Sequence, residues 1–201
     1  MDNVIYIGLS RQRVLEHEIE VISNNVANVD TTGFKVESLT VQTDSEHLSS
    51  DPTSPLLSNV NFPLDAGVMR DFSQGELKAT GGPLNMAIQG QGFFRVSTAN
   101  GERYTRDGAF TLDAQGRIVT AAGDPVQGDG LYANDTNLQP TPSTAQIRQG
   151  MLEQSNVQGI TQITRLIEVS RAYETISQMM DQTSQLSSSA VDRLGRISST
   201  N

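Results

Sequence analysis

Apolar residues near the start of the chain recur with the spacing of a helix. From residue 15 onward the intervals alternate between four and three, which is typical of a heptad seam. This pattern predicts a helix over residues 4–29, about 39 Å long at 1.5 Å per residue. Gly33 is a favourable exit residue, because glycine adopts positive φ at little cost. The residues of the seam are Leu15, Ile19, Ile22, Val26 and Val29.

A second and longer seam occupies the C-terminal part of the chain. It predicts a helix over residues 156–197, about 63 Å long, with Ser155 or Asn156 as the N-cap. Serines dilute its last half, so that half should be weak when isolated. The seam runs through Ile163, Leu166, Val169 or Ser170, Tyr173, Ile176 and Met180, and continues through Thr183, Ser187, Ala190, Leu194 and Ile197.

Between the two helices the pattern changes to short β-type runs separated by turn signals. Runs such as 84–88 and 93–96 alternate with hairpin-type turns at 100–101, 107–108 and 113–116. The flanking stretches are polar, contain Pro or Gly and have no period, so they are predicted as linkers. The expected organisation is an N-terminal helix with its exit (1–35), an extended arm (36–66), a β domain (67–127), a linker (128–149) and a C-terminal helix (150–201).

The fold class predicted from these patterns is α+β. The N- and C-terminal helices are expected to form a coiled-coil-like pair, with an all-β hairpin domain between them in the sequence. Apolar residues make up only 36% of the chain and aromatic residues 5%, which is low for one compact domain. Part of the burial is therefore expected to come from other chains.

Charge and composition exclude several classes of function. The chain has 14 Lys and Arg against 23 Asp and Glu, a formal charge of −9, and no basic stripe for a phosphate backbone, so nucleic-acid binding is not expected. The absence of Cys excludes disulfides, thiolate metal sites and Cys nucleophiles. No apolar run approaches the roughly 18 residues that cross a bilayer. No secretory signal pattern is present, so we expect a soluble, unprocessed chain.

No set of residues predicts a catalytic, cofactor or metal site. His17 and His47 are too few for a zinc site without Cys. Gly90-Gln91-Gly92 lacks the third glycine of a dinucleotide loop and is interpreted as a turn before a strand. The stretch 123–130 lacks the spacing of a calcium loop and is also interpreted as turn chemistry. Paired carboxylates for glycoside cleavage stay formally open, but we expect no enzyme, no cofactor and no metal.

The informative polar residues are asparagines in the last turns of the first helix. Asn24, Asn25 and Asn28 are poor helix formers, because their amides compete for backbone hydrogen bonds. Either they belong to a frayed helix end that terminates at Gly33, or they bond to neighbouring subunits of an assembly and set its register. From their chemistry alone the two interpretations are equal.

Four separated parts of the chain resemble the motifs of bacterial flagellar rod and hook proteins. Residues 24–35 resemble the N-terminal signature of that family, with Ser23 in place of a common Ala. The start of the chain and the short β domain look most like proximal-rod members, with distal-rod members next and the hook protein less similar. The other matching segments are Ile88–Phe94, Tyr104–Phe110 and Leu112–Gly116 in the middle, Gln149–Val157, and Ile167–Glu174.

The resemblance implies a location, a role and partners. In such proteins the terminal helices pair as the inner layer of a helical tubule, and the β domain lies outside. Subunits leave through the flagellar type III export apparatus and assemble in the periplasm into the basal-body rod, which transmits motor torque to hook and filament. The expected partners are copies of the chain, other rod proteins and the export apparatus. The turn at Gln127 and the segment from Leu131 lie closer together than in relatives, so the β domain is trimmed or the sequence omits a stretch.

On this basis the two seams are expected to pack together within and between subunits, and the asparagines with Gly33 to fix the helix exit and neighbour contacts. A secreted peptidoglycan-cleaving enzyme is the rival from another class, and it requires an indispensable carboxylate. A coiled-coil adhesin or spacer would explain the helices but not the motifs. The residues expected in the assembly interface are Leu15, Ile19, Ile22, Asn24, Asn25, Val26, Asn28, Gly33, Phe34, Leu166, Val169, Tyr173, Ile176 and Met180.

Overall fold

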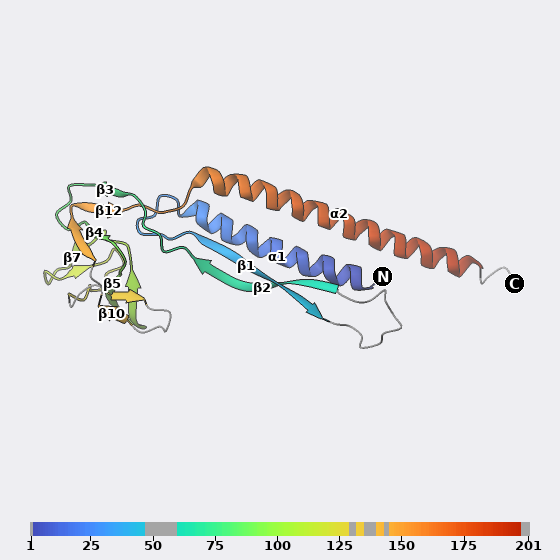
Figure 1. Cartoon of the computed structure of the whole chain (residues 1–201), viewed down its shortest axis with the longest axis horizontal. Coiled ribbons are helices and arrows are strands. Elements are labelled where there is room, and N and C mark those ends of the chain that lie inside the picture. Colours follow the sequence, from blue (N-terminus) through green and yellow to red (C-terminus); the bar gives the residue numbers. More distant parts are fainter. Residues whose placement is uncertain (1, 47–59, 129–131, 135–139, 143–144, 198–201) are drawn as a thin grey trace. The chain divides into compact units, whose positions relative to one another are not determined.

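The computed structural model describes residues 2–46, 60–128, 132–134, 140–142 and 145–197. It is α+β, with a helix at each end of the element order and small strand pairs between them (Figure 1). The chain divides into two compact units. Unit 1 comprises residues 1–24, 37–69 and 160–201, and unit 2 comprises residues 25–36 and 70–159.

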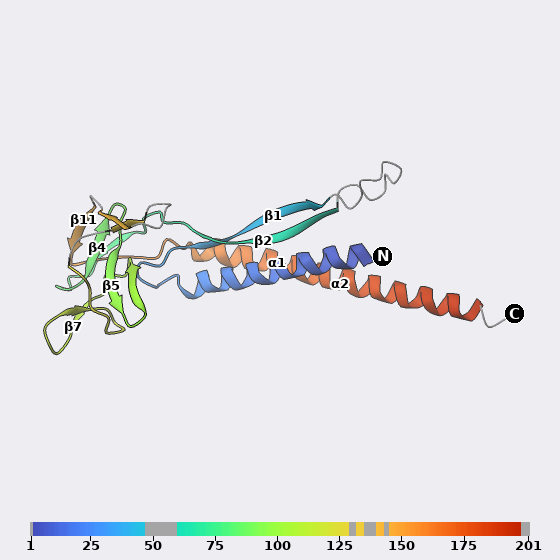
Figure 2. The same cartoon turned by 90° about the horizontal axis from the view of Figure 1, so that it is seen from below.

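Unit 1 holds most of both helices, α1 (Asp2–Ala27) and α2 (Gly159–Ile197). The helices lie side by side in both views (Figures 1 and 2). Gln12 Nε2 donates to Tyr173 Oη at 2.9 Å, and Arg165 Nη2 donates to Glu18 Oε1 at 2.7 Å. Since higher numbers on α1 meet lower numbers on α2, the two helices are antiparallel. Both predicted helices are present: α1 begins and ends two residues earlier than predicted, and α2 begins three residues later but ends at the predicted Ile197.

A strand pair, β1 (Glu37–Glu46) and β2 (Val60–Arg70), runs alongside α1 in both views. The sequence predicts an extended arm without regular structure in this range. Pro63 argues against a central strand, but a two-stranded ribbon has only edge strands, where proline is tolerated. Beside the predicted Leu15 and Ile22, α1 also buries a second stripe, Val14 and Val21.

Unit 2 is built from short antiparallel pairs, and its first strands pair with its last. β4 pairs with β11 and β3 with β12, whereas β5–β6 and β7–β8 are local hairpins at the predicted turns 100–101 and 113–116. The strands are β3 (Leu77–Ala79), β4 (Met86–Gln89), β5 (Phe94–Thr98), β6 (Gly101–Thr105), β7 (Thr111–Leu112), β8 (Ile118–Val119), β9 (Tyr132–Asn134), β10 (Pro140–Pro142), β11 (Gln146–Gln149) and β12 (Met151–Glu153).

The core of unit 2 is small. It consists of Ile88, Phe94 and Phe110, with half-buried apolar residues around it. The rings of Phe94 and Phe110 meet edge to face, with centroids 5.0 Å apart, a favourable arrangement for an aromatic pair. The core holds the β4–β11 pair against the β5–β6 hairpin.

The structure differs from the sequence prediction at three further places. The predicted linker 128–149 contains β9, β10 and β11; β11 is exposed at every position, so it shows no apolar alternation to reveal it. Helix α2 begins at Gly159 rather than after a cap at Ser155 or Asn156. Ile163 is half exposed, so the seam that faces α1 excludes it.

Some expectations fall outside the described residues. His47 and the end of the predicted calcium-like turn, residues 129 and 130, belong to this group. Within the described part of the chain, neither helix has an 18-residue stretch apolar enough to cross a membrane.

Candidate functional site

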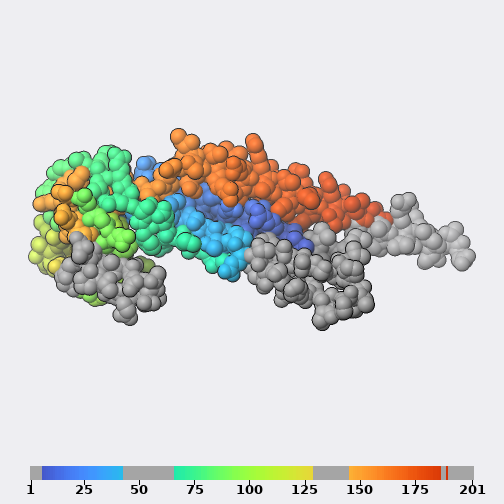
Figure 3. Space-filling model, viewed as in Figure 1, coloured from blue at the N-terminus to red at the C-terminus, as the bar shows by residue number. Residues whose placement is uncertain are grey.

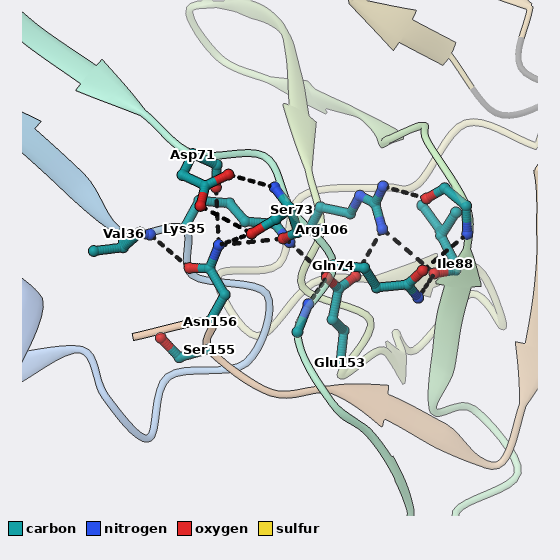
Figure 4. A network of polar contacts seen from close by, with 12 residues as sticks. Lys35, Val36, Asp71, Ser73, Gln74, Ile88, Arg106, Glu153, Ser155 and Asn156 are labelled. Atoms are coloured by element: carbon teal, nitrogen blue, oxygen red, sulfur yellow. Dashed lines mark hydrogen bonds and ion pairs between the residues drawn. The ribbon is translucent and has the colours of Figure 1, made fainter. Parts of the chain in front are cut away.

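The centre of unit 2 is a buried carboxylate that holds two cations. Glu153 ends strand β12, and its side chain is 0% exposed. Lys35 Nζ lies 2.6 Å from Glu153 Oε1, and Arg106 Nη1 lies 2.7 Å from Glu153 Oε2 (Figure 4). The three residues come from three different motif segments, so the motifs meet at one point. We call Lys35, Arg106 and Glu153 the triad.

Backbone groups satisfy most of the remaining hydrogen bonds of the triad, whereas the buried Arg106 Nε has no hydrogen-bond partner among the described residues. Gly75 N donates to Glu153 Oε1 at 3.0 Å. Lys35 Nζ donates to the Ser73 carbonyl at 2.7 Å, and Arg106 donates to the carbonyls of Ile88 and Gly90. These bonds matter because they help to offset the cost of removing the three charges from water. The triad nevertheless keeps one more positive than negative charge.

A second carboxylate, that of Asp71, lies beside the triad. Its pKa is lowered, chiefly because the backbone N–H of Ser73 donates to it and secondly because the Ser73 hydroxyl does. The charge of Lys35 adds a smaller lowering. Asp71 therefore stays ionised to lower pH than an ordinary aspartate, and it places a negative charge near the positive excess of the triad.

Gly33 allows the helix exit to approach the segment that carries Arg106. Its φ is 68°, and a Cβ at this position would lie 2.4 Å from the carbonyl carbon of Arg106. Gly33 N donates to the Glu153 carbonyl at 2.8 Å. Beside it, Thr32 Oγ1 donates to Asp107 Oδ1 at 2.6 Å. Any residue but glycine would have both a strained backbone and a clash here.

Asn156 closes the junction on its other side. Its Nδ2 donates to the carbonyl of Asp71 at 2.9 Å, and its Oδ1 accepts from Val36 N at 2.7 Å (Figure 4). The backbone N of Asn156 donates to the Phe34 carbonyl at 3.4 Å. Because the side chain is occupied in this way, it does not cap α2. Together with Gly33 and the triad, Asn156 forms what we call the junction.

The chemistry of the junction is suited to holding chain segments together rather than to reacting with a substrate. Its charged groups are buried and bonded to one another. A hollow of about 400 Å³ lies beside Arg106 and is bordered by Phe72 and Phe93. Within the described residues, no three His, Asp or Glu side chains are grouped so as to hold a metal ion. The arrangement can fix three chain segments to each other.

The structure places the predicted interface residues in several environments. Leu15, Ile22 and Val169 are buried, and Asn25 is fully buried within its own chain. Asn24 is exposed. The half-buried members are Ile19, Val26, Asn28, Gly33, Phe34, Leu166, Tyr173, Ile176 and Met180.

The charged residues of the triad were not singled out from the sequence. Each lies inside a segment that resembles the family, and Lys35 and Glu153 directly follow the apolar Phe34 and Leu152. A charged residue that directly follows an apolar one inside a motif segment is the signal that could have identified Lys35 and Glu153.

Two family models match the chain. One, described as "Flagella basal body rod protein", matches residues 5–35, and the other, described as "Flagellar hook protein FlgE/F/G D1 domain", matches residues 87–173. The range 87–173 includes Arg106 and Glu153, and the range 5–35 ends at Lys35. The segments that resemble the family in the sequence are thus the ones that the models match.

Relatives cover the chain from end to end. A FlgF rod protein of Caulobacter vibrioides is 44% identical over 98% of this chain and 100% of its own length. A FlgF protein of Mesorhizobium japonicum is 29% identical over 97% and 99%. A FlgG rod protein of Agrobacterium fabrum is 27% identical over 85% and 91%.

The alignment with the Caulobacter protein runs over 248 positions, more than the 201 residues of this chain. The relative therefore holds stretches without a counterpart here, which agrees with the short spacing after Gln127. The predicted resemblance to proximal-rod members is confirmed. With 44% identity over the whole length of such a protein, the chain belongs to the FlgF family of flagellar basal-body rod proteins.

Proposed function

We propose that this chain is a structural subunit of the flagellar basal-body rod, which polymerises into a helical shaft and transmits motor torque to hook and filament. The observation that carries the proposal is the junction, because residues of three family motifs converge there on buried charges that are bonded to one another. Buried, mutually bonded charges make this part of the subunit stiff, and a part that transmits torque needs stiffness. Membership of the FlgF family supports the same role.

The partners and location follow from the same family. The chain would occupy the proximal rod in the periplasm, where it would contact copies of itself and other rod proteins. Hook proteins are more distant members of the same group of proteins. It would reach this place through the flagellar type III export apparatus. It would act as a structural part and not as an enzyme.

In the rod, α1 and α2 would pair in a coiled-coil manner. Three contacts in unit 1 support this pairing: Gln12 with Tyr173, Glu18 with Arg165, and the close approach of Gly8 to Met180. They follow one another along the middle of α1, from Gly8 to Glu18, as a continuous seam requires. The predicted interface residues that are only half buried would complete their burial against neighbouring subunits.

The proposal is tested by mass spectrometry of detergent-extracted basal bodies, with and without the gene. We expect to find the chain in the basal body, and rod assembly should stop before the distal rod when the gene is deleted. Intact rods without the chain would contradict the proposal, as would turnover of peptidoglycan by the purified monomer.

A variant test addresses the seam. Ile22→Asp places a charge at a buried position of α1 and should abolish incorporation into rods while unit 2 stays folded. Tyr173→Asp should do the same, because it removes the partner of Gln12. Ser23→Asp is the matched control, since Ser23 is exposed beside Ile22. Normal motility with the first two variants would refute the assignment of the seam.

A further inference from the structure

We infer that unit 1 carries two complementary apolar surfaces, a ridge and a groove, through which one copy of this chain binds the next. The inference rests on the proposed function and adds to it the surfaces of self-contact. The ridge consists of Ile160, Ile163 and Ile167 on α2. The groove lies between α1 and α2, where Gly8 of α1 meets Met180 of α2.

The ridge is a line of isoleucines that the described part of the chain leaves open to solvent. Ile160 is 86% exposed, Ile163 50% and Ile167 49%. The spacing of three and four residues places them on one face of α2, away from the buried Val169 that faces α1. Isoleucine is among the residues most often buried in proteins, so three of them in a row on an open face indicate a contact surface.

The groove is a hollow of about 240 Å³ with mainly apolar walls. Ile7 and Gly8 line it on α1, and Ile176, Met179 and Met180 line it on α2. Gly8 gives the groove its depth, because a Cβ at this position would lie 3.1 Å from Met180 Cγ. Met179 stands at its rim, 61% exposed. Methionine adapts its shape to a partner more easily than branched residues do.

The two surfaces face in nearly opposite directions. Met179 follows Ile163 by 16 residues, which is roughly 160° around the helix axis and about 24 Å along it. In Figure 3 the first turns of α2, in orange, stand out along the edge that α1 does not cover. The ridge of one copy therefore cannot reach its own groove. A ridge that fills the groove of a second copy leaves another ridge and another groove free.

A second copy is the occupant that these surfaces favour. The groove is continuous with the α1–α2 contact, so a third helix that enters it extends the packing already present between Gly8 and Met180. Contacts between two different surfaces of one chain generate open helical arrays when the rotation does not close. With parallel copies, this contact displaces each neighbour by about 24 Å along α2.

Disulfide cross-linking in assembled basal bodies tests the inference. The chain has no Cys, so every cross-link of this chain to itself must use engineered positions. The test variant carries Ile163→Cys and Met179→Cys, both at exposed positions where folding should persist. An intrachain bond is excluded by the separation of about 24 Å, because a disulfide needs Cα atoms within about 7 Å. The control carries Ile163→Cys and Gln178→Cys, the exposed residue beside Met179.

We expect the test variant to form a ladder of dimers, trimers and longer species on a non-reducing gel after mild oxidation. The control and each single-Cys variant should stay monomeric. Dimers from Ile163→Cys alone would show a ridge-to-ridge contact and overturn the inference. The absence of a ladder from basal bodies that contain the test variant would also overturn it, while leaving the rod function intact. Absence of the unmodified chain from basal bodies would instead refute the proposed function.

Discussion

Replacing Glu153 with glutamine keeps the shape of the side chain and removes the charge that holds the triad together. In the native protein Glu153 accepts from Lys35 at 2.6 Å and from Arg106 at 2.7 Å, at a position with 0% side-chain exposure. In the variant the two cations remain buried beside a neutral amide, whose NH₂ group faces one of them. Removal of one partner from a buried ion pair typically costs about 3–5 kcal/mol.

The same geometry predicts an order among variants. Lys35→Met leaves Glu153 and Arg106 as a neutral buried pair, and methionine follows the path of the lysine chain. Its cost should therefore be smaller than that of Glu153→Gln. In the double variant that combines Glu153→Gln with Lys35→Met, Arg106 is the one cation of the triad left without a counterion. The combined loss should fall short of the sum of the single losses by about 0.5–3 kcal/mol, the range for residues in one network.

Urea unfolding of the purified chain, followed by circular dichroism, measures these differences. In thermal unfolding, the same loss of 3–5 kcal/mol corresponds to a fall in Tm of about 6–20 °C in a chain of this size. The reasoning fails if Glu153→Gln costs about 1 kcal/mol, no more than an ordinary hydrogen bond. It also fails if Lys35→Met is the more destabilising change, because the excess positive charge would then not matter.

Four further substitutions test other features of the structure. Gly116→Ala should cost about 1–2 kcal/mol for its left-handed backbone, because Gly116 has a φ of 78° but no atom lies near the added Cβ. Gly33→Ala should cost clearly more in the same unfolding assay, because its Cβ would clash with the backbone of Arg106. Equal losses would contradict the close approach of Gly33 to Arg106. Ser73→Ala should raise the pKa of Asp71 part of the way to its ordinary value, since the backbone N–H remains, as followed by NMR titration. The stabilisation from ionised Asp71 is present at neutral pH and is lost as pH falls from the ordinary pKa of aspartate through the lowered pKa of Asp71. In the variant this stabilisation should be smaller and its loss complete at a higher pH, and an unchanged pKa would refute the role of the hydroxyl. Leu15→Ala should cost about 2–5 kcal/mol by leaving a cavity in unit 1, and a loss below that range would mean that the site collapses around the smaller residue.

The helices could be predicted from the sequence because their evidence is local. Apolar residues every three or four positions mark one face of a helix, and α1 and α2 follow that spacing closely. The ribbon of β1 and β2 could not, because its strands are polar and Pro63 lies within one of them.

The triad is the part of the candidate site that local patterns cannot reveal. Lys35 and Glu153 are separated by 118 positions, and Arg106 lies 47 positions before Glu153. No periodicity connects residues so far apart, and each charge taken alone is typical of a solvated surface. The motifs mark these residues as special but not as partners. Only the pairing of β12 with β3 and the approach at Gly33 bring them together.

The junction also determines how unit 2 carries a load. Two of its segments, residues 25–36, where the chain first passes through the unit, and residues 150–159, where the chain finally leaves it, are bonded directly to each other. The bonds join Gly33 N to the Glu153 carbonyl, Val36 N to Asn156 Oδ1, and Lys35 to Glu153. A force applied between these two segments is therefore resisted by a buried ionic contact. The local hairpins β5–β6 and β7–β8 lie outside that path, because their hydrogen bonds join only neighbouring residues. For a subunit of a rod, this arrangement explains why the family motifs meet where two segments that connect unit 2 to the rest of the chain are bonded to each other.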